Sequence, residues 1–199
     1  WESTNADSGG GFTVDTASSV GTTYTIALKF SFADVAGYRK IIDYKDRASD
    51  NGFYFLDGQL VFYPFEEESP DAYPAETPLD LVAVREATGP LSGTFTVYAV
   101  GGDGLLTELF SVDDPDGESI PADNGATGTL LGFFFDDLDF VGEATLTGRV
   151  YDLRIWADRA LTVEEIEAEV LPPAPPAPPA PPASPPAARP TEASPSFTG

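Results

Sequence analysis

The chain has 199 residues without cysteine or histidine, and its 33 acidic residues outnumber 10 basic ones to give a formal net charge of −23. Without cysteine the chain forms no disulfide, and without histidine it lacks the usual general base of hydrolases and the most common transition-metal ligand. A charge this negative repels phosphate backbones and anionic lipid surfaces, so we expect no nucleic-acid binding, and no apolar run is long enough for membrane insertion.

Composition divides the chain into three parts. Residues 1–11 are rich in Ser, Gly, Asn and Asp and are predicted to form a flexible lead-in. Residues 12–170 form one predicted domain, large enough to bury a core without a metal or a disulfide. Residues 171–199 are dominated by Pro and Ala. A first residue of Trp1 fits a mature N-terminus after signal-peptide removal, or a fragment of a longer protein.

Alternating apolar residues predict a series of β-strands. Between Tyr24 and Phe32 every second residue is apolar, which is typical of a half-buried strand. The Asp57-Gly58 pair between two apolar runs indicates a hairpin. Turn residues separate the strands, and long helical patterns are missing. The predicted strands begin near Phe12 and continue with residues 22–32, 39–45, 52–56, 59–63, 79–85, 93–100, 105–112, 130–135 and 148–156.

One short helix is predicted after the last strand, beginning near Leu161 and ending before Pro172. Thr162 is a good N-cap, and Glu165 three residues later completes a capping box. The acidic first turn also suits the helix dipole.

The end of the domain resembles the closing segment of laminin-G-like, concanavalin A-like domains. In those domains a glycine precedes a strand of the type x-Asp-x-Arg-Ile-Trp, and an Arg-Ala-Leu-Thr-x-x-Glu-Ile turn follows. The matching positions are Gly148, Asp152, Arg154, Ile155, Trp156, Arg159, Ala160, Leu161, Thr162, Glu165 and Ile166.

Residues 80–98 resemble the central hairpin of the same family, in which an arginine, here Arg85, faces solvent and the second strand ends at a tyrosine, here Tyr98. The family continues directly into an Asn-Gly or Asp-Gly turn, whereas this chain inserts further residues before Asp103. The resemblance implies an all-β, antiparallel jelly-roll sandwich with one short C-terminal helix. This fold serves lectins, glycan hydrolases, adhesion modules and structural subunits, so it does not assign a function.

Two acidic runs are candidates for the carboxylates of a glycosidase, which would lie close together among aromatic residues. They are Asp136-Asp137-Leu138-Asp139 and Glu66-Glu67-Glu68. Neither has the ordered spacing of the hydrolases with this fold, and acidic runs are usually solvated. We therefore predict no catalytic residues and no enzymatic activity.

Calcium is the one cofactor that the sequence suggests. Four carboxylates, those of Asp113, Asp114, Asp116 and Glu118, surround a glycine-containing turn, and calcium prefers oxygen ligands. The spacing departs from the EF-hand pattern, and a chain this acidic produces such clusters by chance, so we expect no cofactor, with calcium as the alternative.

Exposed aromatic residues are the other candidates for binding. Successive side chains of a strand point to opposite faces, so Phe133, Phe134 and Phe135 cannot all face one core. Phe134 is therefore predicted to be exposed as a partner surface, unless both faces are covered. Tyr63, Phe65 and Tyr73 either form a sugar platform or, as we prefer, cover the edge of the sandwich.

The tail repeats Pro-Pro-Ala, which matches the three residues per turn of polyproline II and predicts a semi-rigid extended rod. It resembles the arms of hydroxyproline-rich extracellular glycoproteins, which implies hydroxylated and glycosylated prolines; a plain linker is the alternative. N-glycosylation is excluded because Asn5, Asn51 and Asn124 lack the acceptor pattern. The modification candidates are Pro172, Pro173, Pro175, Pro176, Pro178, Pro179, Pro181, Pro182, Ser184, Pro185 and Pro186, with further hydroxyls on Thr191, Ser194, Ser196 and Thr198.

Together these features predict an extracellular structural glycoprotein that self-assembles through its jelly roll and tail into a homo-oligomer or filament. The alternative is a carbohydrate-binding or adhesion module on a proline-rich stalk. In either case the expected location is extracellular or on the cell surface, and the expected partners are glycans and further copies of the chain.

Overall fold

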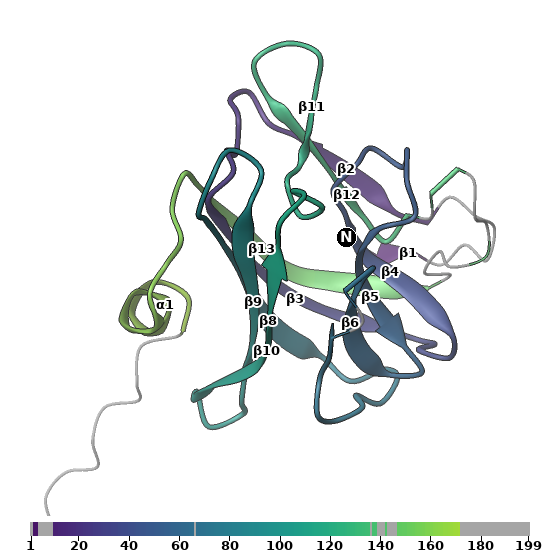
Figure 1. Ribbon diagram of the computed structural model, residues 1–199. Helices are drawn as coiled ribbons and strands as arrows, with labels where there is room; N and C mark the ends of the chain where they lie inside the picture. The colour runs from purple at the N-terminus through teal and green to yellow at the C-terminus, as the bar shows by residue number, and fades with distance from the viewer. Residues whose placement is uncertain are drawn as a thin grey trace, which may run out of the picture.

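The computed structural model describes residues 2–3, 10–65, 67–135, 137–138, 142 and 147–171. The modification candidates from Pro172 onward lie outside these residues, as do Glu66, Asp136 and Asp139. The strand-forming alternation of the sequence produces two antiparallel sheets that face each other, and one short helix packs outside them (Figure 1). The predicted antiparallel jelly-roll sandwich is confirmed.

The first sheet contains the longest strands of the protein. Its central strand pairs along most of its length with neighbours on both sides. In spatial order the sheet consists of β1 (Glu2–Ser3), β13 (Gly148–Ala157), β3 (Tyr24–Phe32), β8 (Leu79–Ala87), β9 (Gly93–Val100) and β10 (Leu106–Asp114).

The second sheet is built around a hairpin at Asp57-Gly58. Both turn residues have positive φ, 51° and 89°, as the predicted two-residue turn requires. In spatial order the sheet consists of β11 (Ala122–Asp123), β12 (Thr129–Phe133), β4 (Tyr38–Asp43), β5 (Gly52–Leu56), β6 (Gln59–Tyr63) and β7 (Glu67–Glu68), with β2 (Phe12–Asp15) paired to β12.

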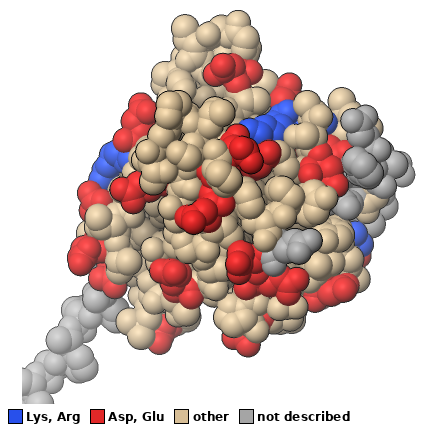
Figure 2. Space-filling model, viewed as in Figure 1, with Lys and Arg blue, Asp and Glu red and all other residues tan. Residues whose placement is uncertain are grey.

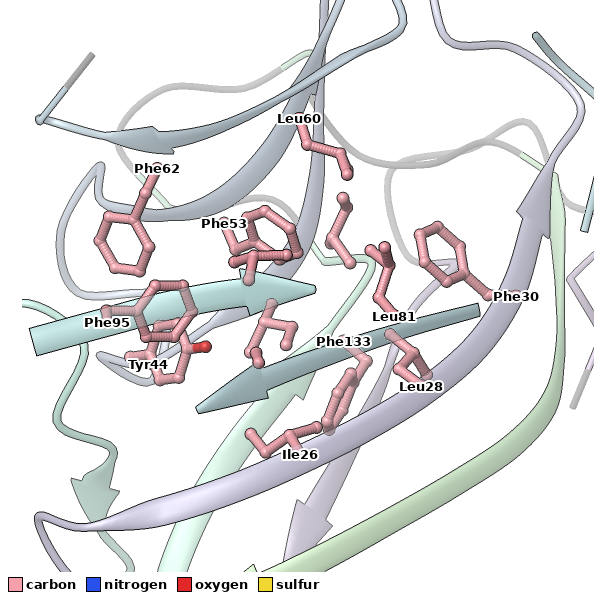
Figure 3. Close-up of a cluster of buried hydrophobic side chains, with 14 of the residues drawn as sticks. Ile26, Leu28, Phe30, Tyr44, Phe53, Leu60, Phe62, Leu81, Phe95 and Phe133 are labelled. Carbon is pink, nitrogen blue, oxygen red and sulfur yellow. The ribbon is translucent and has the colours of Figure 1, made fainter. Parts of the chain in front are cut away.

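The core between the sheets is rich in aromatic side chains, which point toward one another from the two layers (Figure 3). Phe62 of the second sheet meets Phe95 of the first with ring centroids 4.7 Å apart. Phe30 and Phe55 make a similar contact at 6.0 Å. Such pairs add to the hydrophobic stabilisation of the core.

The prediction that Phe134 forms a partner surface is wrong, because its side chain is 0% exposed. Strand β12 ends at Phe133, and Phe134 takes a φ of 64° while its N–H donates to the carbonyl of Ile41. This left-handed residue interrupts the alternation of a strand, so Phe133 and Phe134 both enter the core. Phe134 contacts Phe32 with ring centroids 4.8 Å apart.

Helix α1 (Val163–Glu169) covers the outer face of the first sheet (Figure 1). Thr162 caps it, and the predicted capping box with Glu165 is present. Leu161 and Ile166 are buried against Ala27 and against strand β8. Strand β3 is therefore buried on both faces along most of its length, whereas the sequence predicted a half-buried strand. The alternation identified the residues that face the core between the sheets, but it did not reveal that α1 covers the other face.

Three further differences from the predictions are local. Glu2–Ser3 pairs with β13, whereas the sequence indicated a loop. The two-residue strands β7 and β11 were not predicted, since so short a segment carries no periodicity. Arg85 is completely buried, not exposed to solvent, because it forms an ion pair with Asp114 at 3.2 Å inside the protein.

Candidate functional site

The outer face of the second sheet carries a group of tyrosines from three neighbouring strands. Strands β5 and β6 direct Phe53, Phe55 and Phe62 into the core. The alternation of the strands then leaves Tyr54 and Tyr63 on the opposite face. Helix α1 lies on the far side of the other sheet and does not cover this face (Figure 1).

Four residues line a pocket of about 240 Å³ on this face: Tyr38 of β4, Asp50, Tyr54 of β5 and Tyr63 of β6. Tyr38 and Tyr63 are partly exposed, whereas Tyr54 is buried and forms the inner wall. The rings of Tyr38 and Tyr54 meet edge to face with centroids 5.8 Å apart. We call this group the tyrosine pocket.

Asp50 gives the tyrosine pocket a carboxylate at its rim. The hydroxyl of Tyr54 donates to Asp50 Oδ1 at 3.1 Å, which fixes the orientation of both side chains. Pockets that bind small molecules combine apolar and aromatic walls with a few fixed polar groups, and this pocket has that composition.

A buried charged group lies directly behind the inner wall. Lys40 Nζ sits 5.0 Å from the centroid of the Tyr54 ring. It also donates to Asp43 Oδ2 at 3.2 Å and to Asp137 Oδ2 at 3.4 Å, and all three charged side chains are completely buried. We call these three residues the lysine triad. Tyr54 therefore belongs to the pocket on one side and contacts the triad on the other.

Two other depressions were compared with the tyrosine pocket. One of about 250 Å³ includes Ser31, Glu76 and Tyr151 in its lining. Another of about 310 Å³ lies between α1 and β9 and is lined by threonines with the single aromatic residue Tyr98. The first is lined by two aromatic residues, Phe32 and Tyr151, and the second by one, so the tyrosine pocket with its three tyrosines is the better candidate for a ligand.

The predicted aromatic platform is only partly assembled. Tyr63 enters the pocket, but Phe65 stacks on Phe62 with centroids 5.4 Å apart, and Tyr73 packs against the core. Burial raises the pKa of the Tyr73 hydroxyl above its usual range. The preferred interpretation, that these residues cover the sandwich, holds for Phe65 and Tyr73.

The four predicted calcium ligands do not converge on one point, and the described residues contain no group of three or more carboxylates that could hold a metal ion. Asp114 is buried in its ion pair with Arg85, whereas Asp113 and Asp116 are exposed. Burial alone would raise the pKa of Asp114, but hydrogen bonds from Ser119 and the Glu118 backbone, with the charge of Arg85, lower it below the usual range.

The turn between Gly117 and Ile120 already contains a cation. Lys45 Nζ donates to the carbonyl of Gly117 at 2.6 Å and to that of Ile120 at 3.1 Å. Burial lowers the pKa of this lysine from its ordinary value. An ammonium therefore interacts with oxygens next to the predicted calcium ligands.

The described residues of the two acidic runs also lie in different environments. Glu67 and Glu68 are exposed on β7, and Asp137 is buried in the lysine triad. Neither Glu67 nor Glu68 lines the tyrosine pocket. Sequence reasoning missed the pocket itself, because its tyrosines come from three strands and only their pairing brings them together.

Acidic side chains are spread over the visible surface, whereas Lys and Arg appear in few places (Figure 2). The sequence has 10 basic residues against 33 acidic ones, and Lys40 and Arg85 are buried inside the protein. An anionic ligand is therefore repelled over most of this face.

No protein-family model and no curated protein sequence matches the chain. Among solved structures, it is similar to a chain of botulinum neurotoxin type C, whose cell entry is dependent upon interaction with two ganglioside molecules. The TM-score is 0.49 at 11% identity, over 84% of this chain and 44% of the other. This chain thus spans less than half of that one, and the likeness is too distant to indicate a function. Within the described residues, no helix has the length and apolar character needed to cross a bilayer.

Proposed function

We propose that the chain is a carbohydrate-binding or adhesion module that holds one sugar ring in the tyrosine pocket. The observation that supports this is the convergence of three tyrosines and one carboxylate on a sheet face that helix α1 does not cover. Tyrosine rings offer flat apolar faces to the C–H face of a sugar, and their hydroxyls exchange hydrogen bonds with sugar hydroxyls. The volume of about 240 Å³ lies below the ~300–1,000 Å³ of pockets for drug-sized ligands, so it suits a single ring.

The charge of the protein favours a neutral sugar. Asp50 accepts hydrogen bonds but cannot donate one when ionised, so it suits sugar hydroxyls and disfavours a sugar carboxylate. The net charge of −23 adds a general repulsion of anionic glycans. Hexoses and their neutral oligomers are therefore the expected ligand class.

Binding without chemistry is part of the proposal. A glycosidase needs two carboxylates on either side of the scissile bond, whereas Asp50 is the only acidic residue among the described residues that line this pocket. We propose further that the module is extracellular, presented on its proline-rich stalk. Its membership in the laminin-G-like family remains a prediction from the motif between Gly148 and Ile166.

Retention on immobilised neutral glycans tests this proposal, with titration calorimetry of the sugars that are retained. Tyr63→Ala removes a half-exposed wall without opening the core, and we expect binding at least about tenfold weaker, a loss of ~1.4 kcal/mol. Tyr151→Ala is the matched control, since Tyr151 is 49% exposed outside the pocket. Absence of binding to every neutral sugar, or equal losses in both variants, would contradict the proposal.

Assembly into a filament remains a prediction from the tail, which lies outside the described residues. Sedimentation of the same samples tests it separately. A filament subunit sediments as large particles with or without sugar, and stable contacts between subunits bury about 1,000 Å² or more. An isolated binding module sediments near its chain mass of 21.1 kDa.

A further inference from the structure

The lysine triad combines an amine and two carboxyl groups in a site without solvent. Lys40 lies on β4, Asp43 ends the same strand, and Asp137 follows β12, the neighbouring strand. The amine is 3.2 Å from one carboxylate oxygen and 3.4 Å from the other. Each carboxyl carbon is one bond beyond the oxygen that contacts the amine, so the amine is held next to the atoms that it could attack, and burial excludes the water that would compete.

Backbone donors hold Asp43 in place. Asp43 Oδ1 accepts the backbone N–H of Lys45 at 3.2 Å and that of Arg47 at 2.8 Å. These donors stabilise the negative charge of Asp43 and leave its Oδ2 directed at the amine. Asp137 lies 97 residues from Lys40 in the sequence and approaches the amine from a different segment. The carbon of a charged carboxylate is a poor electrophile, so we assign Asp137 as the group that is attacked and Asp43 as the carboxylate that takes the proton from the intermediate.

We propose that Lys40 and Asp137 are joined by an intramolecular isopeptide bond, which the folded protein forms by itself with Asp43 as the proton acceptor. The bond is independent of glycan binding. It would tie the segment after β12 to β4, in a chain that has no cysteine and hence no disulfide.

The reaction needs no further reagent. A proton passes from the Lys40 ammonium to the Asp137 carboxylate along their hydrogen bond, giving a neutral amine and a carboxylic acid. In a site of low dielectric this neutral pair is favoured relative to its stability in water. Lys40 Nζ then attacks Cγ of Asp137 and forms the new C–N bond.

The tetrahedral intermediate then collapses to the amide. Asp43 takes a proton from the attacking nitrogen and returns it to the departing hydroxyl, so the C–O bond breaks and one water molecule leaves. One ammonium and one carboxylate are consumed, and the net charge of the protein does not change. Tyr54 covers the amine with its ring, 5.0 Å from Nζ, and helps to hold it in place.

Mass spectrometry of the denatured full chain, produced in bacteria so that the tail carries no glycans, tests the bond directly. We expect the sequence mass minus one water molecule. Trypsin should fail to cleave at Lys40, and should release a branched peptide that joins residues 40–45 to residues 86–149, because the second stretch contains no Lys or Arg before Arg149.

The branched peptide also separates this bond from another route to the same mass. Asp-Gly pairs at residues 57–58, 103–104 and 116–117 lose water when they form succinimides, but they leave Lys40 open to trypsin. A full sequence mass together with cleavage after Lys40 in the folded wild type would overturn the proposal.

Three variants assign the roles. Asp137→Asn keeps the shape of the reacting side chain, and we expect loss of one ammonia molecule in place of water. Lys40→Met retains the packing of the stem, and we expect the full sequence mass. Asp43→Asn removes the proton acceptor, and we expect the cross-linked fraction to fall at least tenfold in chains whose near-ultraviolet circular dichroism shows a native fold. An unchanged cross-linked fraction in folded Asp43→Asn would overturn the role of Asp43.

Discussion

Two groups of buried charges differ in what their chemistry allows. Arg85 with Asp114 and Lys40 with its two carboxylates are all completely buried. The guanidinium of Arg85 is planar and delocalised, remains charged, and is a poor nucleophile. The ammonium of Lys40 becomes a nucleophile when it loses one proton. Equal burial therefore produces a structural ion pair in one region and a potentially reactive site in the other.

Hydrogen bonding sharpens this difference. Arg85 donates to the Asp114 carboxylate, to Ser119 Oγ at 2.8 Å, and to the backbone carbonyls of Thr22 and Leu91. These acceptors come from three separate segments, so one side chain connects the residues before β3 to the loop after β8 and to the end of β10. Its fork of donors is matched by fixed acceptors, and a saturated group of this kind stabilises the native state without taking part in reactions.

Removing Arg85 should have the largest effect on stability. In Arg85→Met the carboxylate of Asp114 stays buried without its cation, and loss of one partner of a buried ion pair costs about 3–5 kcal/mol. Urea unfolding followed by tryptophan fluorescence measures the change in the free energy of unfolding.

The double variant Arg85→Met with Asp114→Leu is the control for that measurement. It removes both charges, and we expect it to recover much of the lost stability, because the penalty of the single variant comes from an unpaired charge. A double variant less stable than Arg85→Met would contradict this expectation, and would show that the hydrogen bonds that Asp114 accepts from Ser119 and the Glu118 backbone outweigh the cost of its unpaired charge.

Acid should have the second largest effect, because protonation of Asp114 breaks its ion pair with Arg85. The pKa of Asp114 in the folded protein is lowered from the ordinary value of 3.8. The unfolded chain therefore takes up this proton first, and the stability contributed by Asp114 is present above about pH 4 and is lost as the pH falls through the lowered pKa. Melting temperatures between about pH 6 and pH 2 should fall most steeply at the acid end.

Other carboxylates also respond to acid, so a variant is needed to assign the effect. Arg39 lowers the pKa of Asp34, and a backbone hydrogen bond from Thr162 lowers that of Glu165. Asp114→Asn cannot titrate at this position, and we expect a shallower acid slope than in the wild type. Parallel slopes in the two proteins would contradict the assignment to Asp114.

Features that depend on residues close together in the chain could be predicted from the sequence. The strand β3, the Asp57-Gly58 hairpin and the Thr162 capping box depend on neighbouring residues, and the structure confirms each of them. Local patterns carry local structure because periodicity and turn chemistry operate over a few residues.

Features that depend on distant partners were missed. Arg85 is buried because Asp114, 29 residues away, meets it in the fold. Tyr38, Tyr54 and Tyr63 form a pocket only when β4, β5 and β6 pair in register. No short stretch of sequence indicates that Arg85 contacts Asp114 or that the three tyrosines lie together. The buried charges and the pocket could therefore be recognised only in the structure.

Removing the cap of helix α1 should cost much less stability than removing Arg85, because the charges and hydrogen bonds of the cap face water. Thr162→Ala removes the side chain that accepts the N–H of Glu165 at 3.3 Å, and loss of an N-cap typically costs about 1 kcal/mol. Urea unfolding should show this loss, well below that of Arg85→Met, and Thr162→Ser should restore most of it because the hydroxyl is kept. A loss as large as that of Arg85→Met would mean that α1 depends on its cap more than on Leu161 and Ile166, and the contrast between buried and exposed electrostatics would fail.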